Sequence, residues 1–147
     1  MKYIYSILLC IIFLGCTNSN QSIIKTEDDL SSNIKNGFES YASNDFSFSD
    51  QYSEDVVSRI NNMVIDGRDN LMSGWKAHHD LFYKDINIQD VYVHTNYFSN
   101  GEVWSNAWFT WNATGQITGE EYSNRGHFDY KWEDLSLIHI SEPTRPY

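Results

Sequence analysis

The spacing of hydrophobic positions predicts two helices in the first half of the chain. The first follows Asp28 and Asp29, acidic residues that suit a first helical turn. Its hydrophobic positions recur at helical intervals at Leu30, Ile34, Phe38 and Tyr41. The second runs from about residue 69 to 83 and carries on one face Leu71, Trp75, His78 and Phe82. Between them, the hydrophobic residues of 56–65 are consistent with a strand, followed by a turn at Asp66-Gly67.

After Asp85 the period of the pattern changes from helical to two, which is typical of strands. Residues 88–98, 102–112 and 117–133 read as three long strands joined by turns at 99–101 and 113–116. Gly119 and Gly126 are the expected positions of bulges in the last strand. Two helices followed by an antiparallel meander define an α+β fold. Because the sheet is rich in aromatic residues and has helices on one side, we expect it to curl around a core or a cavity.

The first residues have the pattern of a signal peptide. Lys2 precedes a hydrophobic segment that is too short to span a bilayer as a helix. The segment ends Phe13-Leu14-Gly15-Cys16, which resembles the bacterial lipobox, in which a small residue precedes the cysteine that receives the lipid. We therefore expect residues 1–15 to be a signal peptide, Cys16 to be lipidated, and 16–24 to form a tether. The implied location is the cell envelope, on the periplasmic side of the outer membrane.

Composition excludes several classes of chemistry. The only cysteines are Cys10 and Cys16, so the folded domain is expected to contain no disulfide, no cysteine nucleophile and no Cys-ligated metal. The net charge is −10 and no basic stripe is present, which argues against nucleic acid as a partner. The sequence has no Gly-rich phosphate loop and no local signature of a Ser-His-Asp arrangement, and we predict no cofactor.

The other end of the chain differs from the body before it. Residues 135–145, LSLIHISEPTR, resemble the translation of a transposase adapter used in sequencing libraries. We therefore interpret 135–147 as a non-native tail and give His139 no functional weight. This interpretation places the end of the domain at Asp134 and predicts that the final strand of its sheet is missing.

Residues 25–134 resemble the SnoaL-like branch of the nuclear transport factor 2-like superfamily. The residues that carry the resemblance are Asp66-Gly67-Arg68, Trp75, the run 82–86 (FYKDI), the run 104–115 (WSNAWFTWNATG), Thr118-Gly119 and the strand 122–134 (YSNRGHFDYKWED). The resemblance implies a curved sheet wrapped with helices into a cone, a cystatin-like roll. Its interior is often a ligand pocket. Members of the family include isomerases, cyclases and epoxide hydrolases, and they commonly dimerise through the outer face of the sheet.

The first functional hypothesis is a domain that binds a small, partly apolar ligand in the cone. Tryptophan and tyrosine in a pocket suit a planar or sugar-like ligand. The residues expected to line the pocket are Trp75, His78, His79, Trp108, Tyr122 and Arg125. A metal site is not predicted, because paired zinc ligands on a helix are usually spaced i, i+4, whereas His78 and His79 are adjacent.

The second hypothesis is an isomerase- or hydrolase-like enzyme that uses His127 with Asp129 as an acid/base pair. It requires a bulge at Gly126 to turn these side chains into the cone. Many SnoaL-like enzymes have an acidic residue on the core face of this strand, where this chain has Phe128. A third hypothesis is a protein-interaction domain that uses the outer face of the sheet, with a homodimer as one form.

Overall fold

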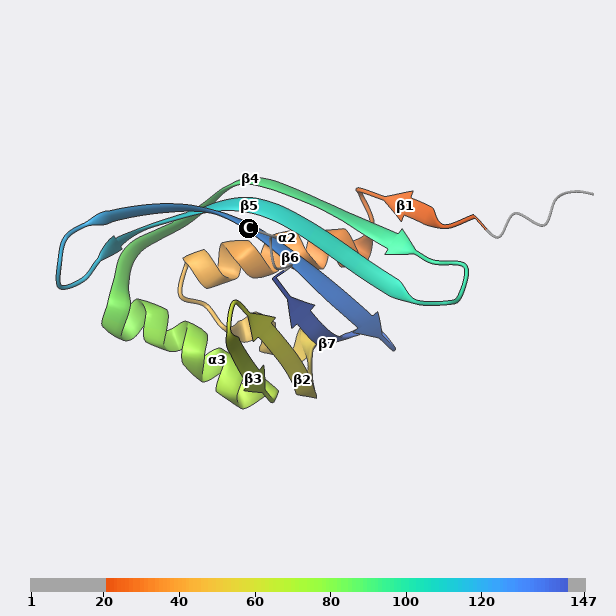
Figure 1. The fold of residues 1–147 in the computed structure, drawn as a ribbon, viewed down its shortest axis with the longest axis horizontal. Helices are drawn as coiled ribbons and strands as arrows, with labels where there is room; N and C mark the ends of the chain where they lie inside the picture. The colour runs from red at the N-terminus through yellow and green to blue at the C-terminus, as the bar shows by residue number, and fades with distance from the viewer. Residues whose placement is uncertain (1–20, 143–147) are drawn as a thin grey trace, which may run out of the picture.

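A seven-stranded sheet curves around two helices in the computed structural model, which describes residues 21–142 (Figure 1). The expected signal peptide, Cys16 and most of the expected tether lie outside the described residues. The elements are β1 (Ile23–Lys25), α2 (Asp29–Ala42), β2 (Tyr52–Ile60), β3 (Met63–Asp66), α3 (Arg68–Ala77), β4 (Tyr83–Tyr97), β5 (Val103–Gly115), β6 (Glu121–Glu133) and β7 (Ser136–Ser141). A 3-10 turn spans Ser47–Gln51, and a π-helical turn spans His78–Phe82. The α+β prediction is confirmed.

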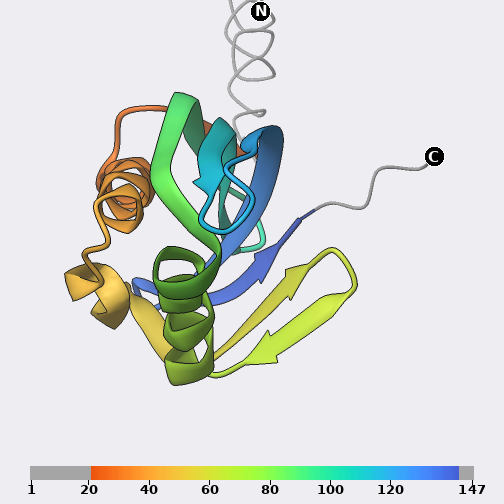
Figure 2. The same cartoon turned by 90° about the vertical axis from the view of Figure 1, so that its left-hand side faces the viewer.

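The strand order is β1-β4-β5-β6-β7-β2-β3, and every neighbouring pair is antiparallel except β2 and β7, which are parallel. Figure 2 shows α2 and α3 on one side of the curved β4–β5–β6 sheet, so that this inner face is covered and the other is not. Among the described residues no helix is long and apolar enough to cross a membrane.

The first helix begins where the sequence predicts. Asp28 is its N-cap, and one carboxylate oxygen accepts a hydrogen bond from the backbone N–H of Ser31 at 2.9 Å. The predicted positions Leu30, Ile34 and Phe38 are all buried against the sheet. The hydrophobic period therefore located both the helix and the face that it buries.

The long strand β4 bends at two bulges. Its register with β5 shifts between Lys84 and Asn87 and again between Gln89 and Tyr92. Asp85 and Asp90 lie inside these shifts and adopt left-handed conformations, with φ of 55° and 54°. Aspartate tolerates this conformation better than most residues, and a bulge bends and twists its strand. The two bulges therefore supply curvature that the periodic pattern did not indicate.

The bulges expected at glycines in the last long strand are absent. The register of β5 and β6 is continuous from Val103–Trp132 to Thr114–Glu121. Gly119 instead lies in the turn before β6, with φ of +69°. Gly126 lies opposite Phe109, and a Cβ placed there would overlap the Phe109 ring. Glycine is required at 126 by this close approach rather than by a bulge.

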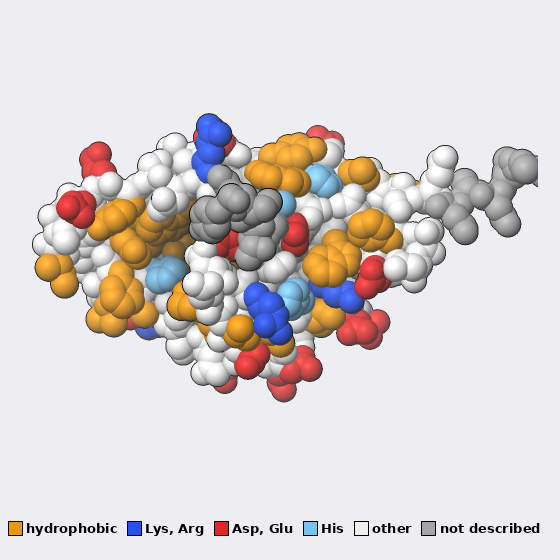
Figure 3. Space-filling view, viewed as in Figure 1, with side chains coloured by type: hydrophobic (Ala, Val, Ile, Leu, Met, Phe, Trp, Pro, Cys, Tyr) orange, Lys and Arg blue, Asp and Glu red, His pale blue; other side chains and the backbone are white. Residues whose placement is uncertain are grey.

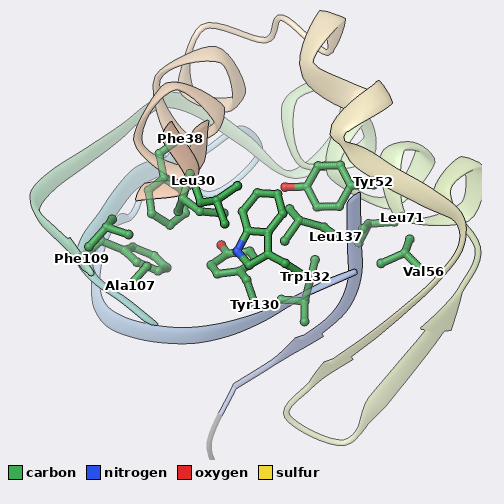
Figure 4. Packing of buried hydrophobic residues seen from close by; sticks show 13 residues of the cluster. Leu30, Phe38, Tyr52, Val56, Leu71, Ala107, Phe109, Tyr130, Trp132 and Leu137 are labelled. Atoms are coloured by element: carbon green, nitrogen blue, oxygen red, sulfur yellow. The ribbon is translucent and has the colours of Figure 1, made fainter. Parts of the chain in front are cut away.

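The final strand, predicted to be missing, is present as β7. Residues of the adapter-like segment pair with β6 on one side and with β2 on the other. Leu137 and Ile140 are completely buried, and Figure 4 shows Leu137 next to Trp132 and Tyr52. The expectation was wrong because it considered only the origin of these residues. Their hydrophobic side chains match a position where the cone has hydrophobic surface to bury.

A chain of buried hydroxyl groups joins the first helix to the sheet. The Ser31 and Thr95 hydroxyl oxygens lie 2.9 Å apart, and those of Thr95 and Ser105 lie 2.8 Å apart. The indole Nε1–H of Trp132 donates to the Ser105 hydroxyl at 2.8 Å. Ser31, Thr95 and Ser105 are completely buried. The chain crosses from α2 through β4 and β5 to β6 and fixes the helix over these strands.

We predict that Thr95→Val destabilises the protein by about 1–3 kcal/mol. Valine has nearly the same shape, but it removes the buried hydroxyl that joins Ser31 to Ser105. Ser31 then keeps only a 3.4 Å contact to the Lys25 carbonyl, and Ser105 only the hydrogen bond from the Trp132 indole. Urea unfolding measures the change. Thr110→Val is a matched control, because the Thr110 hydroxyl makes an exposed hydrogen bond to Asp90, and we expect it to cost at most about 0.5 kcal/mol. Equal losses for the two variants would contradict the prediction.

Candidate functional site

A cavity of about 290 Å³ lies between the two helices and the inner face of the sheet. Most of its wall consists of ring-bearing side chains, among them Tyr41, Phe48, Trp75, His78, Tyr83 and Trp111. Figure 3 shows hydrophobic side chains gathered in a hollow in the left half of the molecular surface, beside an imidazole. The size and composition are those of a site for a small organic molecule.

The clearest polar feature of the cavity wall is a pair formed by Tyr41 and His78. The Tyr41 hydroxyl and Nδ1 of His78 lie 2.9 Å apart. Tyr41 comes from the last turn of α2, and His78 begins the π-helical turn that follows α3. π-Helical turns are rare and are frequently found at functional sites. Two segments distant in sequence thus bring a phenol and an imidazole together in a pocket whose wall consists mostly of aromatic and aliphatic side chains.

Burial keeps both members of this pair uncharged at neutral pH. It raises the pKa of Tyr41 to about 12, partly offset by the Trp111 side chain. Burial also lowers the pKa of His78, and the neighbouring His79 lowers it further. A neutral imidazole whose Nδ1 accepts from Tyr41 carries its proton on Nε2, and the other tautomer reverses the roles. The pair can therefore present either a donor or an acceptor to a ligand.

Of the six residues expected to line the pocket, Trp75, His78 and Arg125 contribute to the cavity wall, with Arg125 at its exposed rim. His79 lies behind Tyr41 and packs its ring edge-on against Tyr41 and Phe46. Tyr122 packs against Tyr83 at 5.6 Å between ring centroids, outside the cavity lining. The three residues found in the wall thus come from the second helical segment (Trp75 and His78) and from the last long strand (Arg125), as the hydrophobic pattern indicated.

Trp108 lies on the opposite face of the sheet from the cavity, contrary to expectation. The inner face of β5 carries Ser105, Ala107, Phe109 and Trp111, so the strand places Trp111 rather than Trp108 against the cavity. Trp108 is 38% exposed and stacks on His127 of β6, with ring centroids 4.3 Å apart. The alternation of side chains along the strand indicates this placement, because Trp108 shares its face with the polar residues Asn106 and Thr110.

His127 and Asp129 do come together, but on the outer face of the sheet. Nε2 of His127 lies 3.1 Å from a carboxylate oxygen of Asp129, and Asn106 donates a hydrogen bond to the same carboxylate. Their neighbours in β6, Phe128 and Tyr130, point inward and line the cavity. Because the strand has no bulge at Gly126, nothing turns the pair inward. It therefore cannot act on a molecule held in the cavity.

Several cavity residues were not singled out from the sequence as site residues. Tyr41 was placed on the hydrophobic stripe of the first helix, but nothing in the stripe distinguishes a cavity wall from a packed core. Tyr83 and Phe48 follow or precede helices at positions without a regular period, and only the fold brings them to the site. Within the described residues, no group of three or more His, Cys, Asp or Glu side chains could hold a metal ion.

No family model and no curated protein sequence matches this chain. Solved structures do. A proposed polyketide cyclase from Pseudomonas putida KT2440 aligns with a TM-score of 0.68 at 14% identity, covering 81% of this chain and 93% of that one. An NTF2-like superfamily protein from Salmonella enterica serovar Typhimurium LT2 aligns with a TM-score of 0.67 at 9% identity, covering 81% and 90%.

A third structure is a protein of ketosteroid isomerase-like fold from Catenulispora acidiphila, solved in complex with trimethylamine. It aligns with a TM-score of 0.58 at 9% identity, covering 76% of this chain and 84% of that one. At identities this low the likeness shows the fold and not the activity. The chain therefore has the NTF2-like cone fold, as the resemblance implied.

We predict that His78 titrates below the ordinary value of 6.5. NMR titration of its imidazole signals measures this directly. Below about pH 6.5 His78 binds a proton more readily in the unfolded chain than in the folded one. The contribution of His78 to stability is therefore fully present above this pH and is lost as the pH is lowered. His78→Gln should weaken that dependence of the melting temperature. A His78 pKa at or above 6.5 would contradict the burial of its ring.

Proposed function

We propose that this domain binds a small, partly apolar ligand in the aromatic cavity of the cone. The observation that carries the proposal is the cavity itself, with its ring-bearing wall and the Tyr41–His78 pair as a polar contact. The hydrophobic rings would supply most of the binding energy, and the pair would fix the orientation of one polar group of the ligand.

The comparisons support a role of this kind in general terms. Neighbours with the same fold include a proposed isomerase and proposed polyketide cyclases, and one was solved in complex with the small molecule trimethylamine. An acid/base activity in the cavity, our second candidate, would use Tyr41 and His78 rather than His127 and Asp129. The 2.9 Å contact between a neutral imidazole and a protonated phenol favours that assignment.

We predict that 2-naphthol, a neutral planar probe, binds in the cavity. In a 1H–15N NMR spectrum, the indole N–H signals of Trp75 and Trp111 should shift on titration, and those of Trp104 and Trp108 on the outer face should not. Gly126→Ala should weaken binding several-fold, because its methyl group would overlap the Phe109 ring and force a shift in the part of the wall that both residues line.

Gly74→Ala is the matched control for that variant. No atom lies within 4 Å of a Cβ at this helical position, so binding should not change. The substitution should also stabilise the helix slightly, by about 0.5–1 kcal/mol. Shifts confined to the outer-face tryptophans would reject the cavity as the binding site.

We also propose that the domain is held at a bacterial membrane, on the periplasmic side of the outer membrane, by lipid on Cys16. The support is the lipobox-like run before Cys16 and the hydrophobic segment that precedes it. We predict that Cys16→Ser abolishes lipidation, so that the protein leaves the detergent-soluble membrane fraction. Cys10→Ser, within the proposed signal peptide, is the control and should have no effect. Unchanged membrane association of the Cys16 variant would refute the anchor.

We retain the proposal that residues 135–145 derive from a sequencing adapter, which sequencing the source gene across codon 134 checks. A genomic sequence encoding this segment would overturn it. Their place in β7 is compatible with either origin, because Leu137 and Ile140 are hydrophobic in both cases. The Tyr41–His78 pair itself lies in α2 and the turn after α3, whereas after Asp134 the cavity wall includes Glu142.

A further inference from the structure

The cavity lies at the ends of the helices that carry partial negative charge. From α2 its wall extends from Ile34, in the middle of the helix, to Tyr41, in the last turn, and includes no residue of the first turn. From the second helical segment it includes Trp75 and His78, and the strand residue Tyr83 that follows. The backbone dipoles of a helix make its C-terminal end attractive to cations. The last turn of α2 has no basic side chain to occupy that potential.

Aromatic rings enclose the same end of the cavity on several sides. Tyr41 and Trp75 meet at 66° with ring centroids 6.0 Å apart, and Tyr83 and Trp111 meet at 85° and 4.9 Å. His78 lies between these pairs, 6.2 Å from Tyr41 and 6.0 Å from Tyr83. Rings that meet at steep angles form corners rather than stacks, so more than one π-face can be turned to a single ligand. The face of an aromatic ring attracts cations.

Positive charge within the described part of the wall is limited to Arg125 at the rim, whose side chain is exposed. No lysine contributes to the wall. Lys76, in the last turn of α3, forms an ion pair with Asp80 at 3.1 Å on the exposed side of the helix. His78, the imidazole in the wall, stays neutral because it is buried. The net charge of −10 also favours the approach of cations over anions.

From these observations we propose that the cavity selects a small cationic amine, with a tertiary or quaternary ammonium group held among Tyr41, Trp75, Tyr83 and Trp111. The inference rests on the proposed function, because it names the chemical class of the ligand for that same site. The ammonium group would lie against the ring faces near the end of α2, and the Tyr41–His78 pair would receive a hydroxyl or carbonyl group elsewhere on the ligand. A neutral ligand of equal shape gains the hydrophobic contacts, but it gains neither the attraction to the helix end nor the attraction to the ring faces.

The test compares choline with 3,3-dimethyl-1-butanol, which replaces the quaternary nitrogen with carbon and keeps the shape. Binding of each to the full chain is measured by isothermal titration calorimetry at constant ionic strength and about pH 7.5. We expect choline to bind at least about tenfold more tightly than the alcohol. Equal affinities, or tighter binding of the alcohol, would overturn the inference and leave the proposed function standing.

Two variants on the same strand localise the effect. Trp111→Leu, in the cavity, should lower choline affinity about tenfold and reduce its preference over the alcohol, whereas Trp108→Leu, on the outer face, should change neither. Equal effects of the two variants would place the binding outside the cavity and overturn the inference. If 2-naphthol binds but choline does not, the ligand class is wrong. If none of the three probes binds, the proposed function fails as well.

Discussion

The position of the first helix depends on one buried hydroxyl group. Thr95 lies near the C-terminal end of β4, completely buried, and its side chain connects Ser31 of α2 with Ser105 of β5. Hydrophobic packing alone would hold α2 against the sheet without fixing its position along the strands, because burial of apolar area has no direction. A hydrogen bond is directional, and a buried hydroxyl without a partner is costly. The chain therefore sets the register of the helix, and the register brings Phe38 and Tyr41 over the inner face of the sheet.

The cavity follows from the shape that this arrangement leaves. The helix is fixed at its N-terminal half, where Asp28, Ser31 and Leu30 contact the sheet, while the bulges at Asp85 and Asp90 bend β4 under its C-terminal half. The side chains in that half are rings, which are flat and stiff and cannot fill an irregular space as a flexible aliphatic side chain does. An aromatic-lined space at the C-terminal end of α2 is the result, and the ligand class that we propose follows from where in the fold this space lies.

The sequence predicted the parts of the fold that depend on period. The stripe on α2, the boundary near Asp69 and the three long strands follow from repeats of about four or of two, and the structure has them within a few residues. It did not indicate β7, because resemblance to an adapter gives no reason to expect a strand, whereas the burial of Leu137 and Ile140 depends only on their hydrophobicity. Nor did it locate the bulges, because Asp85 and Asp90 have polar side chains in an exposed position and no pattern distinguishes them from other aspartates.

The site was predicted less well, for a related reason. The alternation of a strand divides its residues between two faces. Which of these faces is the inner one must be judged from all residues of the strand together. Applied to β5, the hydrophobic set with Phe109 indicates Trp111, whereas the aromatic character of Trp108 alone does not show which face of the strand it occupies. Pairs between distant segments, such as Tyr41 with His78, have no local signal at all. They depend on the register of α2 and on the π-helical turn, which tertiary structure determines.

The two imidazole pairs show why location decides their chemistry. On the outer face His127 has a carboxylate partner, with its Nε2 3.1 Å from an oxygen of Asp129. In the cavity His78 has a phenol partner and a hydrophobic surround, so its neutral form is favoured. A cavity that keeps its own imidazole uncharged leaves the negative ends of the helix dipoles and the ring faces without a resident cation. The attraction of the helix ends and the ring faces for a cation is then available to a ligand. Among ligands of equal shape, it favours the one that carries a positive charge.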